Sequence, residues 1–182
     1  LRADLQATRN VLDLTAAVVE DHSLESPATR LPNRRYLEIW LKAHLYLAQR
    51  RGEAMSVAHW LADPDPETVQ RLRDIAAALR GEDLLGDLGE GEVLLLLPHT
   101  GLEGAQILLD RIRETLGSIP MGATLWEPLH PVDGEDLAIQ QAVLRASEAR
   151  DYSEAHASGG GAEVQWMLLE AAAGSDANAA RP

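Results

Sequence analysis

The stretch "RGEDLLGDLGEGEVLLLLP", from Arg80 to Pro98, decides how the rest of the chain is interpreted. It predicts a strand over 84–88, a tight turn at "GEGE" and a second strand over 93–97. The second strand is apolar at every position, as expected of a strand that is covered on both faces of a sheet. We therefore expect a buried β-hairpin, and its acidic, glycine-rich turn is the first candidate site.

Helical patterns alternate with short apolar segments on both sides of the hairpin. Asn33 is the expected N-cap of a helix over 34–51, and "AMSVAHWLA" follows as a buried strand. The remaining expected elements are helices over 67–80, 102–116 and 135–150 and strands over 121–126 and 163–168. This order predicts an α/β (α+β) fold in which helices flank a central, mostly antiparallel sheet of five strands.

The two ends of the chain differ from this central part. The first 22 residues contain no Gly or Pro and place Leu5, Leu12 and Val19 seven apart. They predict an N-terminal helix, which either forms a coiled-coil seam or packs on its own domain. The last residues are small and polar, as in a disordered tail. The expected division is a signalling helix at 1–25, one domain at 26–168 and a tail at 169–182.

Composition excludes several classes of function. The 29 acidic and 16 basic residues give a formal charge of −13, which argues against DNA or RNA as a partner, so a phosphate-bearing ligand needs a local cluster of arginines. Cysteine is absent, so disulfides and thiol catalysis are excluded. Because the sequence begins at Leu1 without a methionine, we expect the cytoplasmic part of a longer protein, whose other parts can include a membrane anchor.

Two motifs resemble those of GGDEF domains, the diguanylate cyclase family. "TRLPNRRYLE" resembles the family's entry motif, and "RGEDLLGDLGEGEV" resembles its Arg-x-x-Asp, five residues and Gly-Gly-Asp/Glu-Glu-Phe. The spacing of five residues is kept between Asp83 and Gly89. The resemblance covers roughly residues 26 to 168 and implies a ferredoxin-like palm fold.

In that family the hairpin turn is the active site. Its glycines let a nucleotide approach the backbone, and its third residue, an acid, holds magnesium together with an aspartate of the first strand. Here Gly89 and Glu92 keep their family identities. Glu90 replaces the second glycine, Gly91 the metal-binding acid and Val93 the aromatic residue. The resemblance therefore implies a degenerate active-site turn without a metal.

Other parts of the family's catalytic site are also altered. His59 stands about where the metal-binding aspartate is expected, and about ten residues are missing between the first strand and the next helix. His156 replaces a phosphate-binding lysine. Because phosphoryl transfer with two metal ions needs these groups together, we expect no cyclase activity, no cofactor and no metal.

A second site of the family is retained. Arg80 and Asp83 fill the Arg-x-x-Asp motif, and Arg111 lies 31 residues after Arg80, where the resemblance places a further arginine. In active members this site binds cyclic di-GMP as an inhibitor. Arginine can also hold a phosphate or the O6/N7 edge of guanine, and a carboxylate can accept from N1 and N2. A surface ion pair is the alternative for the motif alone, and Arg113 is expected to be exposed.

The expected function is therefore that of a cyclic di-GMP receptor which signals to a protein partner or a linked domain. PelD-type receptors, which control exopolysaccharide secretion and so bear on biofilms, share this combination of a lost active site and a retained inhibitory site. A homodimer formed through the N-terminal helix is a further expectation. The alternatives are a ligand-free structural or dimerisation module and residual enzymatic activity on GTP.

Overall fold

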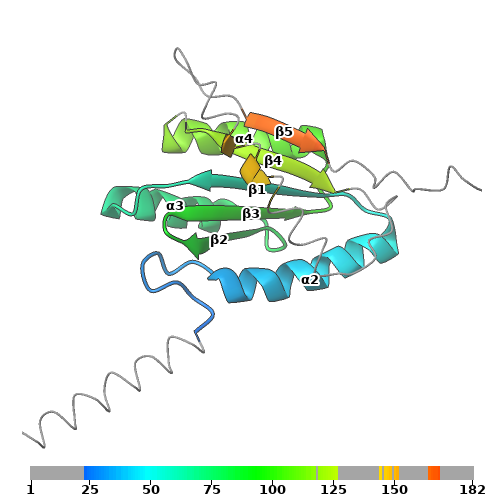
Figure 1. The fold of residues 1–182 in the computed structure, drawn as a ribbon, viewed down its shortest axis with the longest axis horizontal. Helices are drawn as coiled ribbons and strands as arrows, with labels where there is room; N and C mark the ends of the chain where they lie inside the picture. The colour runs from blue at the N-terminus through cyan, green and yellow to red at the C-terminus, as the bar shows by residue number, and fades with distance from the viewer. Residues whose placement is uncertain are drawn as a thin grey trace, which may run out of the picture.

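A five-stranded sheet forms the centre of the molecule (Figure 1). The computed structural model describes residues 23–117, 119–126, 144, 146–148, 150–151 and 164–168. The strands are β1 (Met55–Leu61), β2 (Leu84–Gly89), β3 (Glu92–Pro98), β4 (Met121–Trp126) and β5 (Val164–Leu168), in the spatial order β2-β3-β1-β4-β5. Neighbouring strands are antiparallel except for the parallel pair β4 and β5, which confirms the mostly antiparallel five-stranded sheet.

Helices cover both faces of this sheet, as expected. The helices are α2 (Arg34–Arg51), α3 (Pro66–Ala78) and α4 (Leu102–Leu116). One core cluster joins Leu72 of α3 and Leu109 of α4 to Trp60 of β1. A second cluster joins Leu37 of α2 to Val57 of β1. Because successive side chains of a strand point to opposite faces, β1 supplies both cores, with α2 on one face and α3 and α4 on the other.

Some expected elements lie outside the described residues. These are the N-terminal helix, the tail and most of the helix over 135–150, of which residues 144, 146–148 and 150 are helical. Among the helices that the structure describes, none is long and apolar enough to cross a membrane.

Helix α3 is shorter at its C-terminal end than the sequence pattern predicts. It ends at Ala78, and Leu79 has the extended backbone of a C-cap with ψ 162°. The amide of Asp83 then donates to the carbonyl of Arg80 at 3.0 Å, which closes a turn between α3 and β2. Arg80 and Asp83 therefore lie in this turn and not on the helix.

The close packing of α2 on β2 depends on a glycine. A Cβ at Gly86 would lie 2.6 to 2.7 Å from three side-chain atoms of Leu37. We expect Gly86→Ala to lower the free energy of unfolding by about 1–3 kcal/mol through overpacking, as measured by urea denaturation. Gly81→Ala is the matched control, because a Cβ there meets nothing within 4 Å. Equal stability of the two variants would contradict this packing.

Candidate ligand-binding site

The three residues of the retained motif meet in one cavity of about 360 Å³. The cavity lies between the turn after α3, the end of β3 and the first turns of α4. Arg80, Asp83 and Arg111 all contribute to its lining, although Arg111 is distant from the other two in sequence. Apolar walls come from Leu79 and Leu108. The fold thus brings together the residues that the sequence motif singled out.

Asp83 carries a polar atom that the protein itself does not satisfy. Its Oδ2 accepts from the backbone N–H of Arg80 at 3.2 Å. Its Oδ1 is buried and has no hydrogen-bond partner among the described residues. Burial raises the pKa of the Asp83 carboxyl, while the N–H and the charge of Arg80 oppose that rise. Since buried polar atoms are nearly always paired, Oδ1 is suited to accept from a ligand N–H.

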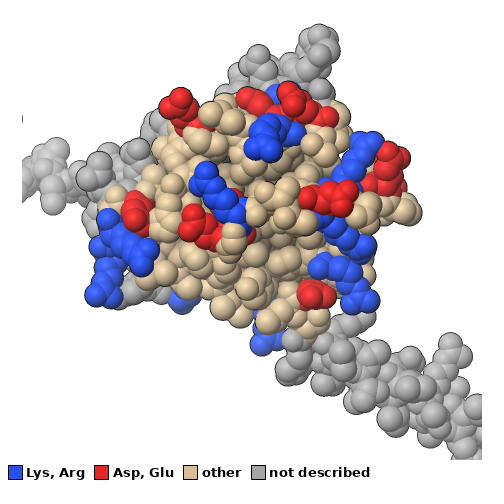
Figure 2. All heavy atoms as spheres, turned by 180° about the vertical axis from the view of Figure 1, so that it is seen from behind, with Lys and Arg blue, Asp and Glu red and all other residues tan. Residues whose placement is uncertain are grey.

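The two arginines of the cavity are available to a ligand. Arg80 and Arg111 are exposed, and neither guanidinium forms an ion pair within the described part of the chain. Arg113 differs, because its Nη1 lies 3.6 Å from Asp110 and only 16% of its side chain is exposed, so the expected exposure of Arg113 is wrong. Figure 2 shows basic and acidic side chains interspersed on the face of the molecule opposite to that of Figure 1.

The hairpin turn is closed by the chain that follows β1. Gly89, Glu90 and Gly91 have φ values of 95°, 55° and 81°, so three successive residues adopt the left-handed conformation. The amide of Ala62 donates to the carbonyl of Gly91 at 2.8 Å. A Cβ at Gly91 would lie 2.8 Å from the carbonyl oxygen of Ala62. The position where the resemblance implies a metal-binding acid thus has no space for a side chain.

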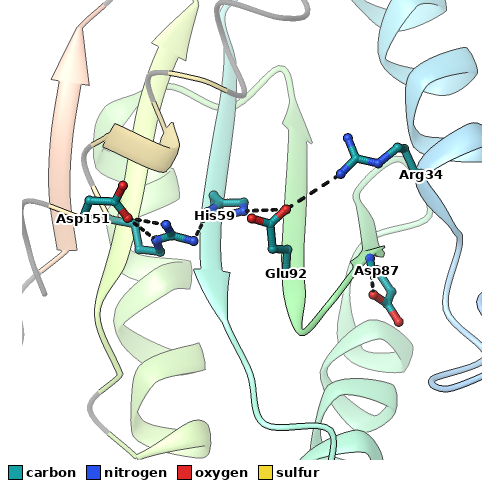
Figure 3. Close-up of polar contacts among 7 residues, drawn as sticks. Arg34, His59, Asp87, Glu92 and Asp151 are labelled. Carbon is teal, nitrogen blue, oxygen red and sulfur yellow. Dashed lines mark hydrogen bonds and ion pairs between the residues drawn. The ribbon is translucent and has the colours of Figure 1, made fainter.

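A row of polar and charged side chains crosses the sheet beside this turn (Figure 3). Glu92 Oε2 lies 3.8 Å from Arg34 Nη2 and 4.0 Å from His59 Nε2. On the other side of the ring, His59 Nδ1 lies 3.4 Å from Arg150 Nη1, and Arg150 pairs with Asp151. Glu92 therefore pairs locally, as expected of a glutamate that does not hold a metal.

His59 is neutral within this row. Its side chain is 1% exposed. Burial above all, and then the charge of Arg150, lower its pKa from 6.5 to about 4. The place where the resemblance implies a metal-binding aspartate thus holds a neutral ring between a carboxylate and a guanidinium. Within the residues that the structure describes, no group of three acids or histidines is arranged to hold a metal ion.

Asp87 organises the hairpin, and the sequence analysis did not single it out. Its Oδ2 accepts from Ser26 Oγ at 2.7 Å and from Thr29 Oγ1 at 2.9 Å, and its Oδ1 accepts from the amide of Gly89 at 2.7 Å. This buried carboxylate joins the entry segment to the hairpin turn. The only signal in the sequence is an aspartate two residues before a turn glycine, a common turn-forming pattern.

Comparisons with known proteins address the fold. No protein-family model matches the chain, and no curated protein matches it significantly. Diguanylate cyclase SiaD from Pseudomonas aeruginosa, in complex with its activator SiaC, is similar with a TM-score of 0.65 and 26% identity over 91% of this chain and 70% of that one. The GGDEF domain of DgcB from Caulobacter crescentus, in complex with c-di-GMP, is similar with a TM-score of 0.62 and 15% identity over 79% of this chain and 92% of that one. The GGDEF domain of FimX from Pseudomonas aeruginosa has a TM-score of 0.60 and 17% identity over 79% of this chain and 99% of that one. The chain has the fold of GGDEF domains, as the motifs predicted.

Proposed function

We propose that this chain is a cyclic di-GMP receptor with a degenerate GGDEF domain that binds the dinucleotide without making it. One observation carries the proposal: Arg80, Asp83 and Arg111 line the same cavity, in which Asp83 Oδ1 is buried and unpaired within the described residues. The complex of DgcB with c-di-GMP supports this ligand class for the fold.

The chemistry of the cavity suits a guanine nucleotide. The guanidinium of Arg80 can donate two parallel hydrogen bonds to O6 and N7 of guanine. The carboxylate of Asp83 can accept from N1 and N2 of the same base. Arg111 can stack on a base or hold a phosphate. Leu79 and Leu108 offer apolar contact to the faces of the bases.

The former active site supports the absence of cyclase activity. Metal-assisted phosphoryl transfer needs carboxylates that hold the ions and cations that hold the phosphates. Here Gly91 lies against the backbone of Ala62, and neutral His59 contacts Arg150. Neither arrangement fits a divalent ion, so the proposed receptor uses no metal and no cofactor.

The receptor would pass its ligand-bound state to a protein partner or a linked cytoplasmic domain. SiaD in complex with its activator supports a protein partner for this fold. PelD-type receptors, which control exopolysaccharide secretion, share the combination of a lost active site and a retained inhibitory site. A dimer through residues 1–25 would couple two copies.

Isothermal titration with cyclic di-GMP tests the proposal. We expect the chain to bind with micromolar or tighter affinity, and Arg80→Ala to weaken binding by about tenfold to a hundredfold, because a hydrogen bond to a charged group is worth about 1.5–3 kcal/mol. Arg71→Ala is the matched control, since Arg71 pairs with Glu67 on α3 and does not line the cavity. If the wild-type chain gave no heat at high concentrations of cyclic di-GMP, the receptor proposal would be overturned. The alternative, a ligand-free interaction module, would then be favoured.

A further inference from the structure

We propose that His99 is a further binding residue of this cavity, which donates to a phosphate of the bound dinucleotide, and that Glu53 is the positioning residue for its ring. This inference rests on the proposed function and deepens it. It adds a donor at the part of the cavity beside the first turn of α4.

The cavity extends along α4. Gly104, Leu108 and Arg111 line it and share one face of that helix. Seven residues of helix separate Gly104 from Arg111, which corresponds to about 10 Å along the axis. Arg111 therefore marks one end, and His99 marks the other, beside the first turn of α4. A ligand that fills this length meets His99.

The charge of Asp83 determines which part of the ligand, base or phosphate, can lie next to it. A carboxylate attracts the N–H donors of a guanine base and repels a phosphate. With Arg80 on the guanine edge, Arg111 and His99 are the lining side chains that we expect to face the phosphates. Of these, His99 is the donor beside the first turn of α4.

The backbone holds His99 in place. His99 directly follows Pro98, the last residue of β3, and has a φ of 53°. The carbonyl of the next residue, Thr100, accepts from Ser56 Oγ at 2.8 Å, which ties the loop to β1. The His99 side chain is 31% exposed. The ring is thus partly accessible from solvent while its main chain is fixed.

Glu53 lies against one nitrogen of the ring. Its Oε2 lies 2.6 Å from His99 Nδ1, with angles outside those of a hydrogen bond. The amide of Glu53 donates to the carbonyl of Ala48 at 3.0 Å, which anchors the residue to the end of α2. Nδ1 therefore faces Glu53, and Nε2 is the ring nitrogen left for the cavity. A carboxylate at one nitrogen of a histidine orients the other toward its ligand.

In the complex, the ring would lie between the carboxylate of Glu53 and a phosphodiester oxygen. Each ring nitrogen can carry an N–H, so one can donate to Glu53 and the other to the phosphodiester. The same contact would connect the ligand to the end of α2 through Glu53.

Titration of the full chain with cyclic di-GMP tests this role. We expect His99→Asn to weaken binding by about tenfold, the effect of losing one charge-assisted hydrogen bond. Asparagine tolerates the left-handed backbone of this position. His44→Asn is the matched control with unchanged affinity, because His44 stacks on Trp40 of α2 and does not line the cavity.

Glu53→Gln separates a positioning role from a general effect on the fold. We expect about threefold weaker binding in the wild-type background and no further weakening in the His99→Asn background. Imidazole nitrogen NMR of the wild-type chain adds a direct signature, because the Nε2 resonance that His99→Asn removes should shift when ligand is added.

The outcomes distinguish the two proposals. If Arg80→Ala weakens binding while His99→Asn binds within twofold of wild type and the Nε2 resonance stays unmoved, the role of His99 is overturned and the receptor stands. If the wild-type chain does not bind cyclic di-GMP, the receptor fails and the role of His99 fails with it.

Discussion

Lowering the pH from 6.5 to 4 is expected to reduce the free energy of unfolding of the wild-type chain by roughly 3 kcal/mol more than that of His59→Gln. His59 is buried among Leu94, Glu92 and Arg150, and its pKa falls from 6.5 to about 4 in the folded chain. Between these two values the unfolded chain binds a proton at this residue and the folded chain does not. Acid therefore favours unfolding over this window, and above pH 6.5 the effect is absent.

Urea denaturation at several pH values measures this difference. Each variant is compared with its own stability at pH 7.5, so that the direct effect of the substitution on packing cancels. We expect the wild-type free energy of unfolding to fall more steeply than that of His59→Gln from pH 6.5 down to pH 4. If the free energies of unfolding of the two proteins fell equally with pH in that window, His59 would not be held neutral in the folded chain.

Gly91→Asp restores an acid to the turn, yet we expect it to destabilise the chain by about 2–4 kcal/mol and to produce no cyclase activity. The φ of 81° is unfavourable for any side chain. The new Cβ would also lie 2.8 Å from the carbonyl oxygen of Ala62, a backbone atom that cannot turn aside as a flexible side chain can. The carboxylate would further join Glu90 and Glu92 at the turn and raise their mutual repulsion.

Gly89→Asp is the matched control for Gly91→Asp. Gly89 also has a left-handed backbone, with a φ of 95°, but a Cβ there meets nothing within 4 Å. It should therefore cost the backbone strain, about 1 kcal/mol, and the repulsion of the added charge. Because both variants carry these two costs, the difference between them reports the clash with Ala62. Turnover of GTP with magnesium, followed by chromatography, measures activity. Formation of cyclic di-GMP by Gly91→Asp would contradict the proposal that the site has been lost by more than one substitution.

Local patterns were sufficient to predict the order of the elements. The apolar run of β3 indicated a strand covered on both faces, and the structure places its alternate side chains in the two core clusters. The end of α3 was predicted two residues late, because the apolar helical pattern continues through Leu79 and the first residue that disfavours a helix is Gly81.

The candidate site was only partly accessible from the sequence. The spacing of Arg80 and Asp83 is local, so a motif can reveal it, and the resemblance also pointed to Arg111. The fold then places all three residues in the lining of one cavity. The contact of His99 with Glu53 joins residues far apart in the chain. No periodicity or spacing rule relates such positions, since the packing of the loops after α2 and β3 brings them together.

The segment before α2 has the composition of a flexible linker, with "SPATRLP" rich in turn residues. The hydroxyls of Ser26 and Thr29 donate hydrogen bonds to Asp87, so the segment is part of the folded domain instead. Arg73 Nε of α3 also donates to the carbonyl of Thr29 at 2.7 Å, so the segment is bound to two elements at once. The segment that enters the domain is therefore held by side-chain hydrogen bonds to both β2 and α3. The Asp87 carboxylate accepts from both Ser26 Oγ and the amide of Gly89, so a single side chain connects the entry point of the domain to the hairpin turn.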